Sequence, residues 1–334
     1  MMKVAILDKY DKDGRKLQLR ELPVPEPGPG EVLVRVRTAG VNPLDNMIIR
    51  GEVKMIVPYR FPLAMGNELV GTVEALGPGA NRFAVGDRVY GRMPLAKIGA
   101  FAEYAAIAET AIAKVPDYLS DEEAACVPLT ALTALQALEL MGAKAGDSLF
   151  ISGGTGSLGA MAVPIAAGKG LTVATNGDGA SEERVRALGA STFIDYRKQD
   201  YAEVLHDMDF VLDTLGDREL PKEFGVLRQD GTLVSLRGLP NGDFAQRAGL
   251  PLWKRIAFGL VGGKYDRMAA KRGQRYRFVF VHEDGEGLAR IPKLMGDKRI
   301  EASVDTVFGL DDVNAALAKV AAGGSKGKTV LKIA

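Results

Sequence analysis

A glycine-rich turn between an apolar strand and a small-residue helix is the feature that most constrains this chain. The segment "SLFISGGTGSLGAMAVPIAAGKG" starts at Ser148 and carries the spacing G-x-G-x-x-G at Gly154, Gly156 and Gly159. A strand pattern precedes the turn, a helix pattern follows it, and the strand "LTVAT" closes the unit. This order predicts a βαβ unit in which a diphosphate approaches backbone N–H groups at a helix N-terminus, around Gly154, Thr155 and Gly156.

The pattern after this turn predicts the fold class. Strand and helix patterns alternate from Ser148, with later strands at "STFID", "DFVLDT", "GTLVSLR" and "RYRFVFV". Such alternation predicts a doubly wound parallel sheet with helices on both faces, a Rossmann-type α/β fold. The long segment Leu239–Met268 interrupts it, with apolar residues at helical spacing. It fits either a helix packed on the core or a pocket wall or lid. The spaced residues are Trp253, Ile256, Ala257 and Leu260.

The first ~115 residues have a different texture. Short alternating or apolar runs such as "VLVRVRTAG", "ELVGTVEALG", "DRVYG" and "FAEYAAI" are divided by Gly and Pro turns, which predicts a β-rich domain. The capping-box pattern "SDEE" at Ser120 marks the change to helical sequence. The tail ends in the strand pattern "KTVLKIA", which we expect to rejoin the first domain.

Charge and cysteine content exclude several classes of protein. Lys and Arg number 43 and Asp and Glu 42, a balance that argues against a nucleic-acid or membrane-surface binder. The single cysteine, Cys126, cannot form an internal disulfide or a Cys-rich metal site. No uninterrupted apolar run approaches the ~20 residues that span a bilayer. A cytoplasmic location is the default expectation.

The end of the second strand favours one dinucleotide over the other. NAD enzymes place an acidic side chain there, whereas this strand ends in the neutral Thr175 and Asn176. Asp178 lies two residues further on and keeps NAD open. Hydroxyl and guanidinium groups that suit a 2′-phosphate follow at Ser181, Arg184, Tyr196 and Arg197. We therefore predict NADPH.

At this point the chain resembles the medium-chain dehydrogenases/reductases, and in particular their zinc-independent quinone oxidoreductase and enone reductase branch. The resemblance rests on "AGVNPLD", "MGNELVGTVEALG", "VGDRVYG", "GAFAEYAAI", "VPLTALTALQAL", "GGTGSLG", "LGASTFIDYR" and "DFVLDTLG". It implies a GroES-like β-rich catalytic domain, residues 1–120 and 285–334, around a Rossmann domain, residues 121–284. A homodimer is expected.

The residues expected to bind zinc are missing. Zinc-dependent relatives carry Cys and His where this chain has Asn42 and Asn67, and they carry a four-Cys structural loop that this chain lacks. An amide is a poor zinc ligand beside thiolate or imidazole. The two histidines, His206 and His282, lie in the predicted Rossmann part and are expected at the surface. We predict a metal-free site.

The resemblance also assigns contacts to the cofactor. It places Asn42 near the nicotinamide and the substrate, and Thr130 at the nicotinamide end, where the Thr130 hydroxyl could instead belong to the helix start. The backbone N–H groups of Ser157 and Leu158 would hold the diphosphate. The resemblance places Leu215 and Ser235, at strand ends, along the cofactor trough.

Without a Lewis acid, a conjugated acceptor is the easier substrate. Hydride addition to an enone delocalises charge into an enolate, whereas an isolated ketone needs its alkoxide stabilised. The expected partner is a small apolar electrophile: an enone, enal or quinone. Tyr59 and Tyr104 are candidate proton donors, each also explicable by packing. The missing ligands disfavour an alcohol dehydrogenase, and a non-catalytic NADPH-binding sensor or accessory protein stays open.

Overall fold

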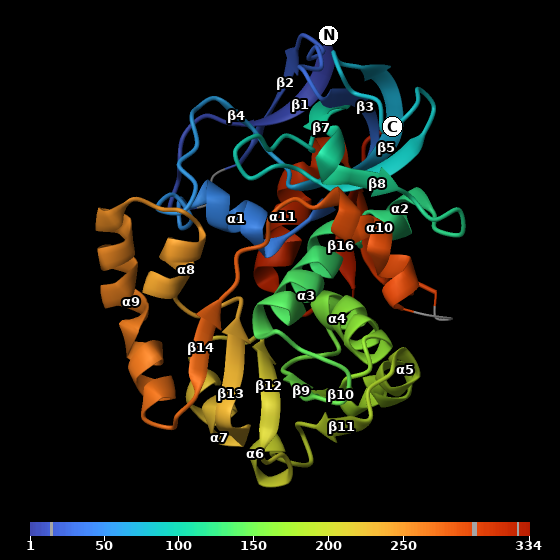
Figure 1. Ribbon diagram of the computed structural model, residues 1–334. Helices are drawn as coiled ribbons and strands as arrows, with labels where there is room; N and C mark the ends of the chain where they lie inside the picture. Colours follow the sequence, from blue (N-terminus) through green and yellow to red (C-terminus); the bar gives the residue numbers. More distant parts are fainter. Residues whose placement is uncertain (14–15, 296–298, 326) are drawn as a thin grey trace. The chain divides into compact units, whose positions relative to one another are not determined.

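The computed structural model describes residues 1–13, 16–295, 299–325 and 327–334, and the chain divides into two units (Figure 1). The first unit is Met1–Leu132, His282–Pro292 and Ile300–Ala334, and the second is Thr133–Val281 and Lys293–Arg299. Residues 121–132, which we had predicted in the second domain, group with the first unit, because helix α2 (Asp121–Ala124) packs against strands of that unit. Helix α3 (Pro128–Met141) crosses the division. His282, predicted in the Rossmann part, also belongs to the first unit; it and His206 are exposed.

Six parallel strands form the sheet of the second unit, in the spatial order β11-β10-β9-β12-β13-β14. By chain order this is 3-2-1-4-5-6, the order of dinucleotide-binding doubly wound sheets, and it confirms the predicted Rossmann-type fold. The strands are β9 (Ser148–Ile151), β10 (Thr172–Gly177), β11 (Thr192–Asp195), β12 (Met208–Asp213), β13 (Leu227–Ser235) and β14 (Arg275–Phe278).

Helices connect these strands. They are α4 (Ser157–Gly168), α5 (Glu182–Leu188), α6 (Tyr201–Val204), α7 (Leu220–Val226), α8 (Gly242–Arg247) and α9 (Leu252–Ala270). Helix α5 ends where Gly189 takes a left-handed φ of 119°, a conformation that favours glycine. Helix α7 ends at Val226, and β13 follows it directly from Leu227.

Helix α9 confirms the helical spacing predicted in Leu239–Met268 but turns that apolar stripe outward. Trp253 is 59% exposed, Ile256 58% and Leu260 77%. The buried face of α9 is a different one and carries Phe258 and Tyr265. The helix therefore packs on the core, one of the two readings of this segment, but through Phe258 and Tyr265 and not through the spaced residues.

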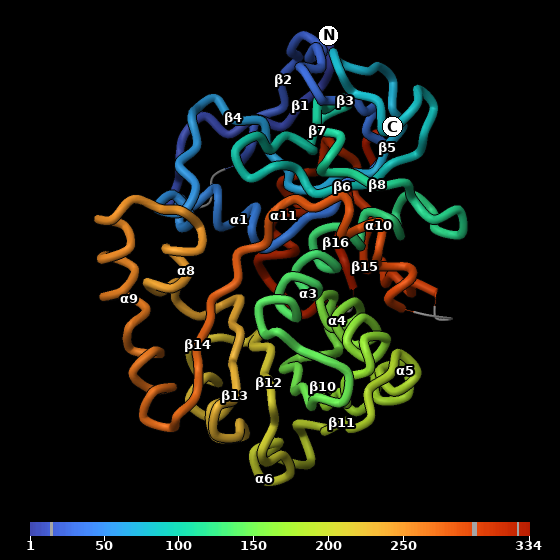
Figure 2. Tube along the Cα trace, in the orientation of Figure 1, coloured from blue at the N-terminus to red at the C-terminus, as the bar shows by residue number. Residues whose placement is uncertain are grey.

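Strands from both ends of the chain build the first unit, and their pairs are antiparallel except for the parallel pair β15–β16. One sheet has the order β2-β1-β4 and the other β15-β16-β3-β5-β6-β8, with β7 also paired to β3. The C-terminal β16 pairs with β3, as expected for the tail (Figure 2). The strands are β1 (Met2–Leu7), β2 (Gln18–Leu22), β3 (Glu31–Val41), β4 (Leu63–Ala64), β5 (Glu68–Leu76), β6 (Arg88–Arg92), β7 (Tyr104–Ala108), β8 (Ile112–Lys114), β15 (Val304–Gly309) and β16 (Lys328–Lys332).

Short helices accompany these strands: α1 (Pro43–Ile49), α2 (Asp121–Ala124), α10 (Gly285–Leu294) and α11 (Val313–Ala322). The stretch Asp121–Met141, which covers α2 and α3, is long and apolar enough to cross a membrane by length and composition alone. However, 83% of its apolar window is buried inside the protein, as in the core helix of a globular fold.

Candidate functional site

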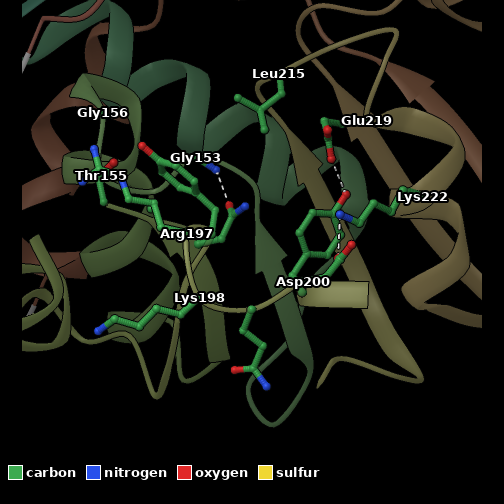
Figure 3. Close-up of a pocket in the computed structure, with 14 residues that line it drawn as sticks. Gly153, Thr155, Gly156, Arg197, Lys198, Asp200, Leu215, Glu219 and Lys222 are labelled. Carbon is green, nitrogen blue, oxygen red and sulfur yellow. Dashed lines mark hydrogen bonds and ion pairs between the residues drawn. The ribbon is translucent and has the colours of Figure 1, made fainter. Parts of the chain in front are cut away.

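A pocket of about 740 Å³ lies in the second unit at the carboxyl ends of the parallel strands (Figure 3). Segments that follow β9, β10, β11 and β12 supply most of its lining. Ligands of open α/β sheets bind at this edge, because the loops there shape a crevice. The predicted cofactor residues that line this pocket are Thr155, Gly156, Asn176, Tyr196 and Leu215.

The three positions of the turn require glycine for different reasons. A Cβ on Gly154 would lie 2.0 Å from Thr175 Oγ1, and one on Gly159 would lie 2.2 Å from the Gly154 carbonyl oxygen. Packing alone therefore requires these two glycines. A Cβ on Gly156 would come no closer than 3.7 Å, to the Gly153 carbonyl oxygen, so the protein leaves room there. Gly156 lines the pocket, where a missing Cβ lets a ligand approach the backbone.

The N-terminus of α4 faces this open position with uncapped donors. Gly156 is the N-cap residue, has extended backbone angles and offers no capping side chain. The N–H groups of Ser157 and Leu158 in the first turn have no intrahelical acceptor. Together with the helix dipole, they favour an anion at this point, as predicted for the diphosphate.

The neutral end of β10 holds the glycine turn in place. The Gly153 N–H donates to Asn176 Oδ1 (2.8 Å), and the Gly154 N–H donates to Thr175 Oγ1 (3.0 Å). The Thr175 hydroxyl in turn donates to the Ile151 carbonyl oxygen (2.6 Å). NAD enzymes carry an acidic side chain at this position. Here it is occupied by the Asn176 amide, whose oxygen already accepts a hydrogen bond from the Gly153 N–H.

Exposed basic side chains line the pocket beside Tyr196. The Arg197 guanidinium lies 2.8 Å from Asp178 Oδ2, and Lys198 Nζ lies 3.5 Å from Asp195 Oδ2. The Arg197 and Lys198 side chains are 64% and 81% exposed, so these ion pairs are weak and an anionic ligand can compete for both cations. Lys198 was not among the residues predicted from the sequence, although it directly follows the "DYR" run.

A second polar group lines the pocket between α6 and α7. The Tyr201 hydroxyl donates to Glu219 Oε2 (2.8 Å), and Lys222 Nζ lies 2.6 Å from Asp200 Oδ1 (Figure 3). Lys222 also lies 4.1 Å from the centre of the Tyr201 ring. These groups satisfy one another, and no sequence signal singled them out.

Ser181, Arg184 and Ser235, which were also predicted to bind the cofactor, are not among the residues that line this pocket. Arg184 donates from Nη2 to the Thr155 carbonyl oxygen (2.8 Å), so it supports the glycine turn from α5. Ser181 occupies the N-cap position of α5 without a side-chain capping bond. The buried Ser235 hydroxyl donates to Asp213 Oδ2 (2.5 Å). Arg184 and Ser235 thus make contacts within the protein, and cofactor binding by the three residues stays a prediction.

In the first unit, Asn42 belongs to a buried cluster of polar side chains. Its Nδ2 donates to Glu68 Oε1 (2.7 Å), and its Oδ1 accepts from Lys328 Nζ (2.5 Å). Lys328 Nζ also lies 2.6 Å from Glu68 Oε1, and these two side chains are 5% and 0% exposed. The amide of Asn42 is thus held at both ends by protein groups. Its predicted contact with nicotinamide and substrate stays a prediction.

Asp45 and Asn67 extend this cluster. Asp45 Oδ2 accepts from the Asn42 backbone N–H (2.8 Å), and Asp45 Oδ1 accepts from Asn67 Nδ2 (2.7 Å). Burial raises the pKa of Asp45 to about 7, because desolvation penalises the charged carboxylate more than these hydrogen bonds favour it. The other carboxylate oxygen of Glu68 accepts from the Leu129 N–H (2.7 Å).

The remaining predicted residues of the first unit have these positions. Thr130 Oγ1 donates to the Cys126 carbonyl oxygen (2.7 Å), the helix-start role we had kept open. Burial raises the pKa of Tyr59 to about 12, with nearby Arg92 acting in the opposite direction. Tyr104 packs against the core cluster of Met2, Val4, Ile6 and Ala102, which is the packing role.

The donor set around Asn42 does not fit zinc. Among the residues that the structure describes, no three or more His, Cys, Asp or Glu side chains form a group that could hold a metal ion. The Asn42 amide oxygen binds an ammonium, Lys328 Nζ, so a positive charge already occupies its surroundings. Amide oxygens are also poor ligands for this ion.

Comparisons with known proteins now decide the family. A family model for the alcohol dehydrogenase GroES-like domain matches residues 28–117, and one described as a zinc-binding dehydrogenase matches residues 188–331. A trans-enoyl reductase from Aspergillus terreus is 30% identical, over 92% of this chain and 87% of its own length. The chain belongs to the medium-chain dehydrogenase/reductase superfamily. The GroES-like nature predicted for the first domain is thereby confirmed.

Two further members of the superfamily are similar to this medium-chain oxidoreductase over most of its length. A 2-methylene-furan-3-one reductase from Solanum lycopersicum is 29% identical over 75% of this chain and 66% of its own length. The solved quinone oxidoreductase from Coxiella burnetii is 28% identical, with a TM-score of 0.81 over 100% of this chain and 99% of that one. The chain is therefore an oxidoreductase whose relatives use nicotinamide cofactors.

Proposed function

We propose that this oxidoreductase uses NADPH to reduce the C=C bond of α,β-unsaturated carbonyl compounds, or quinones. The observation that carries the proposal is the cluster around Asn42, where an amide that accepts from the Lys328 ammonium stands at a position that zinc-dependent relatives give to a ligand. Without a Lewis acid, an isolated carbonyl is hard to reduce. In a conjugated acceptor the developing charge spreads to an oxygen that hydrogen-bond donors can stabilise.

The printed names of the relatives support the same chemistry. They describe a trans-enoyl reductase, a 2-methylene-furan-3-one reductase and a quinone oxidoreductase. Each of these names denotes a conjugated C=C bond or a quinone as the acceptor. A small, apolar and electrophilic substrate is therefore our proposal for this chain as well.

The pocket of the second unit supports NADPH over NADH. Asn176, next to the last residue of β10, carries a neutral amide where an acidic side chain would repel a 2′-phosphate. Tyr196, Arg197 and Lys198 line the same pocket and offer a hydroxyl and two exposed cations. We assign the 2′-phosphate to these three residues rather than to Arg184, whose guanidinium supports the Thr155 carbonyl.

The residues present fit this cofactor. The open Gly156 and the N–H groups of Ser157 and Leu158 would hold the diphosphate. Bound NADPH supplies the hydride. Tyr59, with a pKa of about 12, keeps its proton at neutral pH and so offers a hydrogen-bond donor in the first unit.

Steady-state NADPH oxidation against a panel of enones, enals, quinones and saturated ketones tests the function. We expect turnover with the conjugated acceptors, saturated carbonyl products from the enones, and no turnover with saturated ketones. Tight NADPH binding without turnover on any acceptor would contradict the proposal and favour a sensor or accessory protein.

We also propose that the protein is a homodimer. Light scattering of the purified chain during size-exclusion chromatography would measure its mass directly. A mass near 35.6 kDa, that of one chain, would contradict the dimer.

A further inference from the structure

Arg92 is a buried cation with two unused donors. It is the last residue of β6, lies opposite Glu68 in the β5–β6 pair, and its side chain is 0% exposed. Nη1 donates to the Met93 carbonyl oxygen, but Nε and Nη2 have no hydrogen-bond partner among the described residues. Buried donors without acceptors are costly, and more so when they carry charge.

The carboxylates around Arg92 do not meet this need. Glu68 is bonded to Lys328, Asn42 and the Leu129 N–H. Asp45 is bonded to Asn42 and Asn67, and its pKa of about 7 leaves it partly protonated at neutral pH. Glu68 and Lys328 cancel each other, so Arg92 leaves an excess of positive charge inside the first unit.

The remaining acid near Arg92 is Glu283, whose Oε2 lies 3.9 Å from Nη1. That distance is too long for a hydrogen bond, and the Glu283 side chain is 35% exposed. It approaches the Nη1 side of the guanidinium. The Nε–Nη2 edge, which presents two parallel N–H groups, stays open to a different acceptor.

We propose that Nε and Nη2 of Arg92 bind the carbonyl oxygen of the conjugated substrate and stabilise the oxyanion that forms during reduction. In that step bound NADPH would give a hydride to the β-carbon. The C=C π pair would become the enolate double bond between the α-carbon and the carbonyl carbon, and the C=O π pair would move onto oxygen as O⁻. A proton from water later adds at the α-carbon. This assignment rests on the proposed function, and it gives Arg92 the electrophilic role that a metal has in zinc-dependent relatives.

Access to these donors needs a movement in the first unit. Nε and Nη2 are covered in this structure, so a substrate oxygen reaches them only when a neighbouring side chain withdraws. Tyr59, from the segment between α1 and β4, is half-buried and electrostatically coupled to Arg92.

A phenolate probe tests the oxyanion site without turnover. 4-Nitrophenol changes absorbance when it ionises, so titration with the protein in the presence of NADP⁺ reports both affinity and ionisation. We expect the wild-type protein to bind the phenolate form, and Arg92→Met to weaken this binding about tenfold or more. Arg92→Lys keeps the positive charge but loses the two parallel N–H donors of the guanidinium. Its affinity for the phenolate should therefore lie between those of the wild type and Arg92→Met. Arg88→Met is the matched control, because Arg88 lies on the same strand with its own partners, Asp121 and the Leu119 carbonyl oxygen.

Turnover gives the second readout. Arg92→Met should lower kcat with an enone strongly while NADPH affinity stays unchanged. If Arg92→Met fails to fold, Arg92→Lys decides. Phenolate binding that is absent from the wild type, or equal in wild type and folded Arg92 variants, overturns the inference whatever the turnover. Arg92-dependent phenolate binding without enone or quinone turnover would instead overturn the proposed function alone.

Discussion

The cofactor pocket of the second unit and the polar cluster of the first unit differ in how far their charged groups are exposed to solvent. The pocket offers backbone N–H groups and exposed cations, such as Lys198 at 81% exposure. The cluster pairs Glu68 and Lys328 at 0% and 5% exposure. Exposed pairs are screened and weak, whereas buried pairs are strongly coupled to their surroundings. Substitutions of the exposed cations in the pocket should therefore change binding, and substitutions of the buried Glu68–Lys328 pair should change stability.

The largest effect is expected from breaking the buried pair. Lys328→Met leaves the Glu68 carboxylate buried beside a neutral side chain, and should lower the free energy of unfolding by about 3–5 kcal/mol. Urea denaturation measures this. Lys332→Met on the same strand is the control, because that side chain is 62% exposed and 4.0 Å from Glu122. It should change stability by less than about 1 kcal/mol. Equal losses in the two variants would remove the contrast between the units.

The next effect is a pH dependence that comes from Asp45. Its pKa is about 7 in the folded protein against 3.8 ordinarily, so its contribution to stability is full below pH 3.8 and is lost as pH rises through 7. Asp45→Asn keeps an acceptor for the Asn42 N–H and should be more stable than wild type at pH 8, by at most about 4 kcal/mol.

Urea denaturation at pH 5 and pH 8 tests the Asp45 prediction. The advantage of Asp45→Asn should shrink at pH 5, where the wild-type carboxyl is mostly protonated. Asp311→Asn, at a side chain that is 70% exposed, is the control and should change stability by less than about 1 kcal/mol. An advantage of Asp45→Asn that does not depend on pH would contradict the raised pKa.

A smaller effect, on binding rather than stability, is expected in the glycine turn. Gly156→Ala places a methyl group in the open position, where it meets no atom closer than 3.7 Å, so the fold should be kept. Binding of NADPH should weaken by about 1.5–3 kcal/mol, because a charged hydrogen bond to the diphosphate is lost. Gly159→Ala is the contrast, since its Cβ would lie 2.2 Å from a carbonyl oxygen and should destabilise the protein. Fluorescence titration and thermal unfolding separate the two outcomes, and unchanged NADPH affinity in Gly156→Ala would count against the site.

The smallest effect concerns the choice between cofactors. Asn176→Asp keeps the acceptor for the Gly153 N–H and adds a negative charge at the end of β10. The preference for NADPH over NADH should fall about tenfold, roughly 1.4 kcal/mol. Arg184→Ala should weaken both cofactors alike, because Arg184 holds the turn through the Thr155 carbonyl. Titration with both cofactors checks this. If Arg184→Ala weakened the binding of NADPH alone, Arg184 would be the residue that binds the 2′-phosphate.

The cofactor pocket and the buried cluster also differ in how much of each could be predicted from the sequence. The glycine turn is local: a strand, a turn and a helix within about 20 residues specify the site, and the structure places Thr155, Gly156 and Asn176 on one pocket. Yet the spacing alone could not tell that Gly154 and Gly159 are needed for packing, since that depends on the carbonyl and the Thr175 hydroxyl beside them.

The buried cluster could not be predicted in this way. Glu68 and Arg92 read as ordinary strand residues, and Lys328 comes from the far end of the chain. Pairing of β16 with β3 and of β5 with β6 brings them together, which no local pattern encodes. Helix α9 shows a related limit, because helical spacing at Trp253 and Leu260 gives the helix but not which apolar face turns inward.

The destination of the hydride tests the central claim most directly. The protein should be supplied with an enone and with NADPH that carries deuterium at the transferred C4 position, and the product analysed by NMR. We predict deuterium on the β-carbon, a new α-hydrogen taken from solvent, and a saturated carbonyl product. Deuterium on the carbonyl carbon, with an allylic alcohol as product, would show reduction of an isolated carbonyl and contradict this account.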